Sequence, residues 1–434
     1  MQTCPFPQKT KKSILALGAE SDGNFCFFNT GKIYFSESFD DLLDEKNWQK
    51  YQRAVLEFLK KNKLKPDLII TDLHPLYVTS VWGKELSKKY KAEHIQAQHH
   101  LAHIFSAIGD KILHNASYMV PDTFYGIAMD GTGYGEDEKI WGGEVFKIAS
   151  RKIARIGHLE NQTLIGGDLA VREPARMLIS ILDKVFSASS SPFGRGCHEH
   201  VTGEGKGKLQ RKNYIYSLIK KYYTKNEFEL IHNQLKQNFN CLETSSTGRV
   251  LDAISLLLGF CKNERKYKHE PIALLEANSG KPYNDIKPKI MSAESAQISN
   301  FQFPISNQLP MTKFKNKPQI LDTTFLFEYL VKNLYKDKKR LAATAQLYIA
   351  EGLWKIITEE EKTELGSEAP ELSSVFSGGI ANNKIISEYL ISKGAYASKK
   401  IYPVKLPNGT IFNGVPRGDA GLSFGQIVYY LFPK

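Results

Sequence analysis

A chain of 434 residues is long enough to bury a large hydrophobic core and to form two or three domains or lobes. It has no apolar run long enough to span a bilayer, and residues 1–12 lack the apolar core of a signal peptide, so we expect a cytoplasmic protein. Its net charge of +12 is compatible with nucleic acid or an acidic partner, but the lysines are dispersed and equally suit a solvated surface.

The cysteines exclude two common ways of stabilising a fold. There are five of them, scattered along the chain and without any CxxC pair. This pattern argues against a disulfide framework and against a cysteine zinc ribbon. The five residues are Cys4, Cys26, Cys197, Cys241 and Cys261.

The first part of the chain alternates strands and helices. Residues 1–11 are expected to form a loose polar tail, and the apolar run 13–18 predicts a strand that leads into an acidic, glycine-containing turn at 19–24. A strand directly before Asp72 ends where ligands usually bind in a parallel sheet. This alternation indicates an α/β architecture. Further predicted elements are strands at 25–29, 32–36 and 66–71 and a helix at 48–62.

Three histidines stand at the junction of a predicted strand, 93–98, and a predicted helix, 101–108. His99 and His103 are four residues apart, so they share one helix face and can converge on a metal ion. Asp130, at the end of the apolar strand 124–129, can supply a carboxylate ligand. The alternative is a pair of ordinary core or surface histidines. We favour the metal site because a further histidine, His100, stands between the two, and a carboxylate, Asp130, ends the next predicted strand.

Glycine-rich segments follow three of the predicted strands. Gly131, Thr132, Gly133 and Tyr134 form the first, which repeats the strand–acid–glycine unit found near the start of the chain. Two such units suit a nucleotide whose phosphates lie between backbone N–H groups and a carboxylate-bound cation such as magnesium. Both units could instead be hairpins without a ligand.

Two further glycine turns are candidate nucleotide contacts. Gly167 and Asp168 could hold a ribose or phosphate, or could form a tight loop with Asp168 as a helix N-cap. Gly378 and Gly379 lie between a strand and a helix, where N–H donors face a phosphate or adenosine, and Asn382 can add an amide contact.

Three other features leave alternatives open. Arg249 could reach a phosphate or pair with Asp252 or Glu276, and Asp419 could be an N-cap or a further metal ligand. Residues 187–212 read as a flexible loop. Within that loop, a candidate soft-metal cluster consists of Cys197, His198 and His200.

Taken together, the motifs resemble the carboxy-terminal half of the hydrogenase-maturation carbamoyltransferase family HypF. The resemblance runs from about residue 15 to residue 426, and its motifs occur in the family's order. Each motif is modest alone, whereas the ordered set is specific. The motifs are residues 15–20, 72–75, 98–103, 130–135, 140–144, 167–168 with 172–174, 245–249 with 252–253, 377–379 and 418–419.

The resemblance implies an α/β, actin-like ATPase fold of two lobes, 12–121 and 122–434, with an α-helical insertion at about 185–345 and ATP or AMP in the cleft. It implies a divalent metal, iron or zinc, on the positions that match His99, His103, Asp130 and Asp419. The implied reaction moves a carbamoyl group from carbamoyl-adenylate to a cysteine thiol of the partner HypE. The nucleophile would belong to the partner, so this chain needs none of its own.

The family's acylphosphatase-like segment, cysteine zinc motifs and adenylate-forming domain have no counterpart in this chain. We therefore expect a separate domain or protein to supply the carbamoyl-adenylate. Three alternatives remain: a tRNA threonylcarbamoyl-transferase resembling the TsaD family, which alone would require nucleic acid; a small-molecule O-carbamoyltransferase; and a non-catalytic nucleotide-binding partner.

Overall fold

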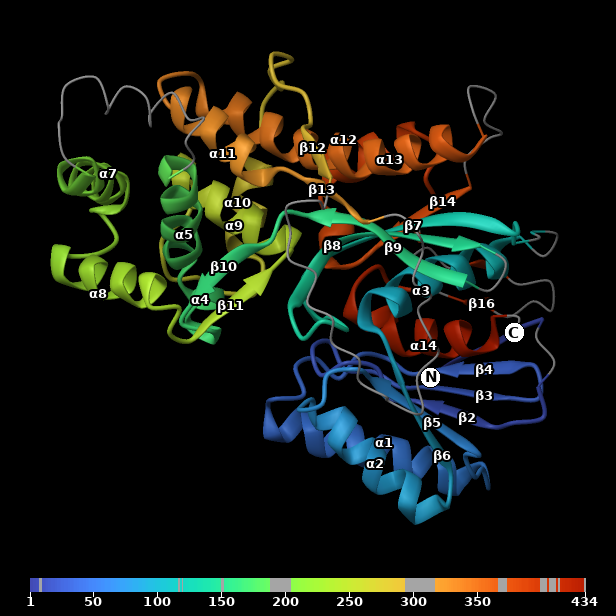
Figure 1. Ribbon diagram of the computed structural model, residues 1–434. Helices are drawn as coiled ribbons and strands as arrows, with labels where there is room; N and C mark the ends of the chain where they lie inside the picture. The colour runs from blue at the N-terminus through green and yellow to red at the C-terminus, as the bar shows by residue number, and fades with distance from the viewer. Residues whose placement is uncertain are drawn as a thin grey trace.

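The structure is a computed structural model, and its elements form two large β-sheets with helices between and outside them, and a small two-stranded sheet (Figure 1). It describes residues 1–7, 10–115, 118, 120–149, 152–187, 204–292, 317–365, 373–398, 404–405, 411–412 and 414–432.

The first sheet has six strands in the order β1-β4-β3-β2-β5-β6. The strands from β1 to β2 pair antiparallel, whereas β2, β5 and β6 pair parallel. The prediction of a loose tail at residues 1–11 is therefore wrong in part, because β1 pairs with β4 and the side chains of Cys4 and Phe6 are buried. The strands are β1 Gln2–Pro5, β2 Ile14–Ala16, β3 Cys26–Asn29, β4 Lys32–Phe35, β5 Leu68–Asp72 and β6 Glu93–Ala97.

Two helices, α1 (Glu45–Lys61) and α2 (Val78–Tyr90), cover the outer face of this sheet (Figure 1). α1 begins at the N-cap Asp44, whose carboxylate accepts hydrogen bonds from two backbone N–H groups of the first turn. Its buried residues recur at helical spacing and pack against the sheet. They are Tyr51, Val55 and Leu59.

Helices α3 (His99–His114) and α14 (Leu422–Leu431) lie between the two sheets (Figure 1). They pack closely, because Gly425 brings the backbone of α14 onto α3: a Cβ atom there would stand 1.9 Å from the carbonyl oxygen of Ala102. α3 joins the first sheet through β6, so its N-terminal histidines lie at the junction of the two sheets.

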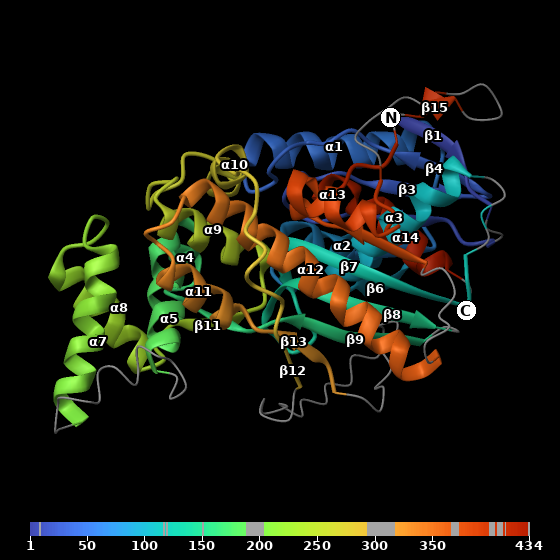
Figure 2. The same ribbon diagram turned by 90° about the horizontal axis from the view of Figure 1, so that it is seen from above.

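The second sheet is built around β7, which pairs parallel with β14 and antiparallel with β8. The sheet continues from β8 through β9 and β13 to β12, while β11 and β10 extend from β8 through a short parallel contact. α12 (Lys338–Leu365) and α13 (Lys384–Ser392) cover its outer face (Figures 1 and 2). The strands are β7 Thr123–Tyr134, β8 Ile140–Ala149, β9 Lys152–Leu159, β10 Gln162–Ile165, β11 Cys241–Thr244, β12 Ile290–Ser292, β13 Gln319–Leu321 and β14 Ser374–Ser377.

The remaining helices gather beside the second sheet, where α7 and α8 stand farthest out (Figure 2). The prediction of a flexible loop at 187–212 is wrong for its last residues, because α7 begins at Glu204. The suggested cluster of Cys197, His198 and His200 lies outside the described residues. The helices are α4 Asp168–Arg172, α5 Pro174–Ser187, α7 Glu204–Ile219, α8 Lys225–Lys236, α9 Thr247–Leu258, α10 Glu270–Ala277 and α11 Thr323–Lys332.

The smaller elements lie late in the chain. They are the 3₁₀ turns η2 (Gly379–Asn382) and η3 (Asp419–Gly421) and the paired strands β15 (Val404–Lys405) and β16 (Ile411–Phe412). Of the helices in the described part of the chain, none combines the length and the apolar character needed to cross a membrane.

Candidate metal centre and adjoining cavity

The N-terminus of α3 brings two histidines to one point. Gln98 caps the helix, with its side-chain oxygen accepting from the backbone N–H of Leu101 at 2.9 Å. His99 and His103 follow at i, i+4, and both are buried, with ring centroids 4.8 Å apart. The predicted convergence of these two side chains is therefore present.

Two carboxylates reach the same point from distant parts of the chain. Asp130 Oδ2 lies 3.2 Å from His99 Nε2 and 3.5 Å from His103 Nε2. Asp419 Oδ1, from η3, lies 3.8 Å from His99 Nε2 and 3.5 Å from His103 Nε2. One ligand atom from each of the four residues lies within 4.8 Å of every other. We call this set the four-residue cluster.

The cluster has the chemistry of a divalent metal site. Donors about 2.1 Å from a tetrahedral metal are about 3.4 Å apart, close to the separations seen here. Within the described residues, His103 Nε2 and Asp419 Oδ1 are buried and lack a hydrogen-bond partner. Two imidazoles and two carboxylates suit zinc or iron, and the carboxylate charges would balance a divalent ion.

The electrostatics of the cluster also favour a cation. Burial lowers the pKa of His99, but Asp72 and Asp130 outweigh burial and raise it well above its usual value. Burial acts against ionisation of Asp130, yet His103 and His99 outweigh it and hold the pKa of this carboxyl well below its usual value. The site thus holds positive charge readily, and a metal ion would take the place of these protons.

Asp72 is a site residue that the sequence did not reveal as such. It is fully buried at the end of β5, and its Oδ2 accepts a hydrogen bond from His99 Nδ1 at 2.7 Å. Its Oδ1 accepts from the backbone N–H of His74 at 2.9 Å. This carboxylate fixes the tautomer of His99 so that Nε2 faces the cluster. The signals for it in the sequence were its position at the end of a predicted strand and its place in the motif at 72–75.

The segment from Gly131 to Tyr134 is not the separate glycine loop that we expected. It is the end of β7, interrupted by an irregularity between Met129 and Gly133 where the pairing with β8 shifts. A Cβ on Gly133 would stand 2.4 Å from His100 Cε1, and one on Gly131 would stand 2.9 Å from Arg249 Nη2. These glycines make room for neighbouring side chains. Thr132 is exposed.

His100 does not belong to the four-residue cluster. Burial lowers its pKa to about 3, so the ring is neutral at ordinary pH. It packs beside Gly133, and its Nδ1 accepts a hydrogen bond from Gln98 Nε2 at 3.1 Å.

A cavity of about 250 Å³ adjoins the cluster. Two of the predicted nucleotide-binding residues, Gly379 and Asn382, line it, and the backbone N–H of Gly379 donates to Asp130 Oδ1 at 3.3 Å. Gly378 stands behind them at φ +104°, where a Cβ would lie 2.1 Å from the Met129 oxygen. The lining consists of Asp22, Asp130, Lys268, His269, Ile272, Ala273, Glu276, Gly379, Ile380, Asn382, Asn383, Gly418 and Asp419.

Gly167 and Asp168 do not line this cavity. Gly167 is the N-cap of α4 at φ 56°, beside Asn240, and Asp168 is the first residue of the helix rather than its cap. The proposed N-cap role of Asp168 is thus wrong. Arg249 contacts this helix, since its Nη1 donates to the Val171 oxygen at 3.4 Å.

Of the three interpretations of Arg249, the structure shows the ion pair with Asp252, at 2.7 Å.

Lys268 and His269 were not expected near the cluster at all. They belong to the polar loop between α9 and α10, and no motif distinguishes them in the sequence. Only the folding of distant segments brings them beside Asp419.

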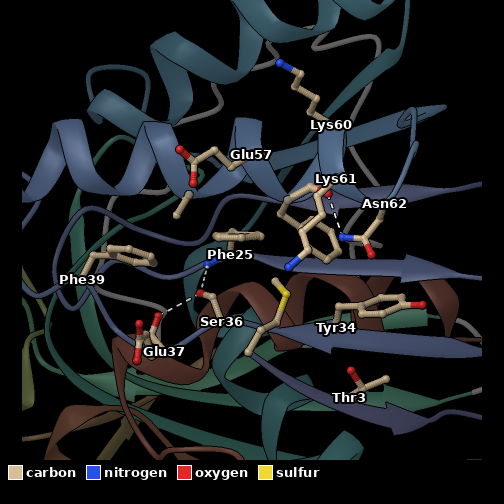
Figure 3. Close-up of a pocket in the computed structure, with 13 residues that line it drawn as sticks. Thr3, Phe25, Tyr34, Ser36, Glu37, Phe39, Glu57, Lys60, Lys61 and Asn62 are labelled. Carbon is tan, nitrogen blue, oxygen red and sulfur yellow. Dashed lines mark hydrogen bonds between the residues drawn. The ribbon is translucent and has the colours of Figure 1, made fainter.

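A second and larger cavity, about 880 Å³, lies on the first sheet (Figure 3). It is open, and aromatic side chains from the first sheet, the segments beside its strands and α1 form its walls, among them Phe25, Tyr34 and Phe39. No predicted site residue lines it. The chemistry predicted from the sequence therefore belongs to the smaller cavity.

Fold and site together define the class: an α/β protein with a buried, metal-competent cluster beside a small polar cavity. The family model described as "HypF Kae1-like domain" matches residues 9–110, and that described as "Carbamoyltransferase, Kae1-like Domain, second subdomain" matches residues 126–426. The chain therefore belongs to the family of HypF carbamoyltransferase Kae1-like domains.

Individual relatives agree with this assignment. The probable carbamoyltransferase HypF of Methanocaldococcus jannaschii is 33% identical over 97% of this chain and 46% of that protein. The crystal structure of T. kodakarensis HypF matches 99% of this chain and 48% of that chain, with TM-score 0.71 and 28% identity. Full-length HypF in a phosphate- and nucleotide-bound form matches with TM-score 0.72 at 22% identity, over 99% of this chain and 47% of that chain, which supports the fold. This chain spans about half the length of these relatives.

Proposed function

We propose that this chain is a carbamoyltransferase of nickel–iron hydrogenase maturation. It moves the carbamoyl group of carbamoyl-adenylate, made from carbamoyl phosphate and ATP, to the C-terminal cysteine thiol of a HypE-like partner. Family membership supports this function. The observation that carries it is the juxtaposition of the four-residue cluster and the small cavity, which share Asp130 and Asp419.

The proposal includes the two-lobed, actin-like ATPase fold, with lobes at 12–121 and 122–434 and an insertion at about 185–345. Two sheets with outer helices, and a helix pair between them, support it. A separate adenylate-forming domain or protein supplies the substrate. A cytoplasmic location suits the thiol chemistry, and Cys4, Cys26, Cys241 and Cys261 are free in the structure.

His99, His103, Asp130 and Asp419 would hold the metal, iron or zinc. When bound, the ion supplies Lewis-acid stabilisation of the charge that develops on the carbamoyl oxygen or the departing phosphate. Asp72 orients His99, and the backbone N–H of Gly379 fixes Asp130. Gly379 and Asn382 contact the nucleotide, whereas Gly131, Gly133 and Gly378 serve the site by allowing close packing.

The reaction needs no nucleophile from this chain. The partner's thiolate sulfur bonds to the carbamoyl carbon, the bond from that carbon to the phosphate oxygen breaks, and AMP leaves. The residues of this chain bind and orient the adenylate beside the cluster, which brings the two reactants together.

The test weighs a HypE-like partner by intact mass spectrometry after incubation with this chain, ATP, carbamoyl phosphate and a separately supplied adenylate-forming domain. We expect a gain of one carbamoyl group, abolished by His99→Ala. His94→Ala is the matched control, because His94 lies on β6 outside the cluster, 3.0 Å from Thr71 Oγ1. An unmodified partner with the wild-type chain would refute the proposal.

A further inference from the structure

Lys268 connects two parts of the molecule across the mouth of the small cavity. It stands in the loop between α9 and α10, yet its Nζ lies 3.2 Å from Asp419 Oδ2 and donates a hydrogen bond to Ser21 Oγ of the first sheet's loop. Asp22 Oδ2 is farther away, at 4.0 Å. Lys268 therefore touches a member of the four-residue cluster on the side opposite the histidines.

The ammonium group has a donor to spare. A lysine carries three N–H donors. Ser21 and Asp419 accept two of them, and Asp22 at 4.0 Å is an ion-pair partner beyond hydrogen-bond length. The side chain is 50% exposed and lines the cavity, so the third donor is available to a ligand there.

Buried ion pairs hold the Lys268 backbone in place. Arg265 Nη1 donates to the Lys268 carbonyl oxygen at 2.7 Å, and its Nη2 lies 3.5 Å from Asp252 Oδ2. Arg249 Nη1 meets the same carboxylate oxygen at 2.7 Å. Because Arg249 also packs on Gly131, beside Asp130, one chain of contacts fixes Lys268 relative to the cluster.

The cavity lining carries charges of both signs. With a divalent ion balancing the two cluster carboxylates, Lys268 adds a positive charge beside Asp419, and the carboxylate of Asp22, which also lines the cavity, lies 4.0 Å from its Nζ. Glu276 stands in the last turn of α10, where it accepts from the backbone N–H of Lys384 at 3.1 Å, and Asn382 and Asn383 line the same cavity. The lining therefore offers an ammonium group to an anionic oxygen, and carboxylate and amide groups to hydroxyl and amine donors.

We propose that Lys268 binds the phosphoryl group of a nucleoside monophosphate or its acyl derivative in this cavity, with the sugar and base toward Glu276. This assignment rests on the proposed function, because it takes the adenylate as the ligand. It makes Lys268 a substrate-binding residue that selects phosphorylated over unphosphorylated nucleosides.

The test compares two ligands that differ only in the phosphate. AMP and adenosine are titrated by calorimetry into the metal-loaded wild-type chain, into Lys268→Met and Lys268→Gln, and into Lys266→Met. Lys266 is the matched control, an exposed lysine two residues away that does not line the cavity. We expect both Lys268 variants to bind AMP at least about tenfold more weakly and adenosine unchanged, because they lose one charge-assisted hydrogen bond. Lys266→Met should match the wild type.

Two results would overturn the assignment: unchanged AMP affinity in both Lys268 variants, or equal loss of AMP and adenosine affinity, which would show that Lys268 only shapes the cavity. If the wild-type chain binds neither ligand, both this assignment and the proposed nucleotide site fail. If the partner is never carbamoylated but AMP binding depends on Lys268 as described, only the proposed function fails.

Discussion

The candidate metal site depends on the orientation of single side chains. His99 presents Nε2 to the cluster because Asp72 takes Nδ1, and Asp72 is itself fixed by the backbone N–H of His74. Carboxylates that orient a metal-binding histidine typically contribute tenfold to a hundredfold to metal affinity. Asp72 would therefore act on a bound metal ion without contacting it.

Asp72→Asn removes this acceptor charge while keeping the shape of the side chain. We expect the affinity for Co²⁺, followed by its visible absorption, to fall about 10- to 100-fold. Asp67→Asn is the control, since Asp67 stands at the opposite end of β5, exposed, and accepts from the backbone N–H of Ser13. Equal Co²⁺ affinity in the wild type and Asp72→Asn would contradict the positioning role.

At the scale of elements, the site depends on the close packing of α3 against α14. The two helices approach so closely at Gly425 that no side chain fits between them, and Phe105 and Tyr429 pack nearby with ring centroids 5.0 Å apart. His103 lies on α3 next to this contact, so the packing also sets where its imidazole stands.

Gly425→Ala should force the helices apart. The added methyl would overlap the Ala102 carbonyl, so we expect the free energy of unfolding in urea to fall by about 3 kcal/mol. Gly280→Ala is the matched control, because its Cβ would meet its nearest atom at an ordinary 3.6 Å. A loss no greater than in Gly280→Ala would show that the helices can separate without cost.

β9 carries a group that makes the second sheet sensitive to acid. His158 is buried, its Nδ1–H donates to the Leu159 oxygen at 2.7 Å, and burial together with Arg155 lowers its pKa to about 4. The unfolded chain protonates near the ordinary value of 6.5. The stability that His158 contributes is therefore present above pH 6.5 and is lost as the pH falls toward 4.

His158→Gln should remove this dependence. Between pH 7 and pH 4.5 the wild-type chain should lose about 2 kcal/mol more free energy of unfolding than the variant. Urea unfolding followed by circular dichroism at the two pH values measures the difference. Parallel losses in both chains would mean that His158 is not held neutral in the folded state.

At the scale of the whole molecule, the cluster joins α3, β7 and η3, and more than half of the chain separates Asp130 from Asp419. His99, His103 and Asp130 could be predicted because helical spacing and the end of a strand are local signals. For Asp419 the sequence left an N-cap and a metal ligand as alternatives, and the family resemblance favoured the ligand. Lys268 could not be predicted, since its place depends on long-range packing of the loop before α10 against the first sheet.

For the fold, too, local patterns in the sequence were predictive, whereas features that depend on long-range pairing were missed. Hydrophobic patterns predicted the α/β architecture, the strands β2 to β6 of the first sheet and the helix α1, but they gave no prediction for α2. They failed at residues 130–134, where glycines read as a loop, because pairing with β8 extends β7 through them. They also missed β1, a short edge strand with little pattern of its own that is stabilised by pairing with β4.

The most direct test of the central claim counts metal ions. The chain is purified after expression with iron and zinc, and its metal content is measured by inductively coupled plasma mass spectrometry. The four-residue cluster predicts about one ion per chain in the wild type and in His94→Ala, and far less in His103→Ala. A metal-free wild-type chain, or equal metal content in His103→Ala, would contradict the account.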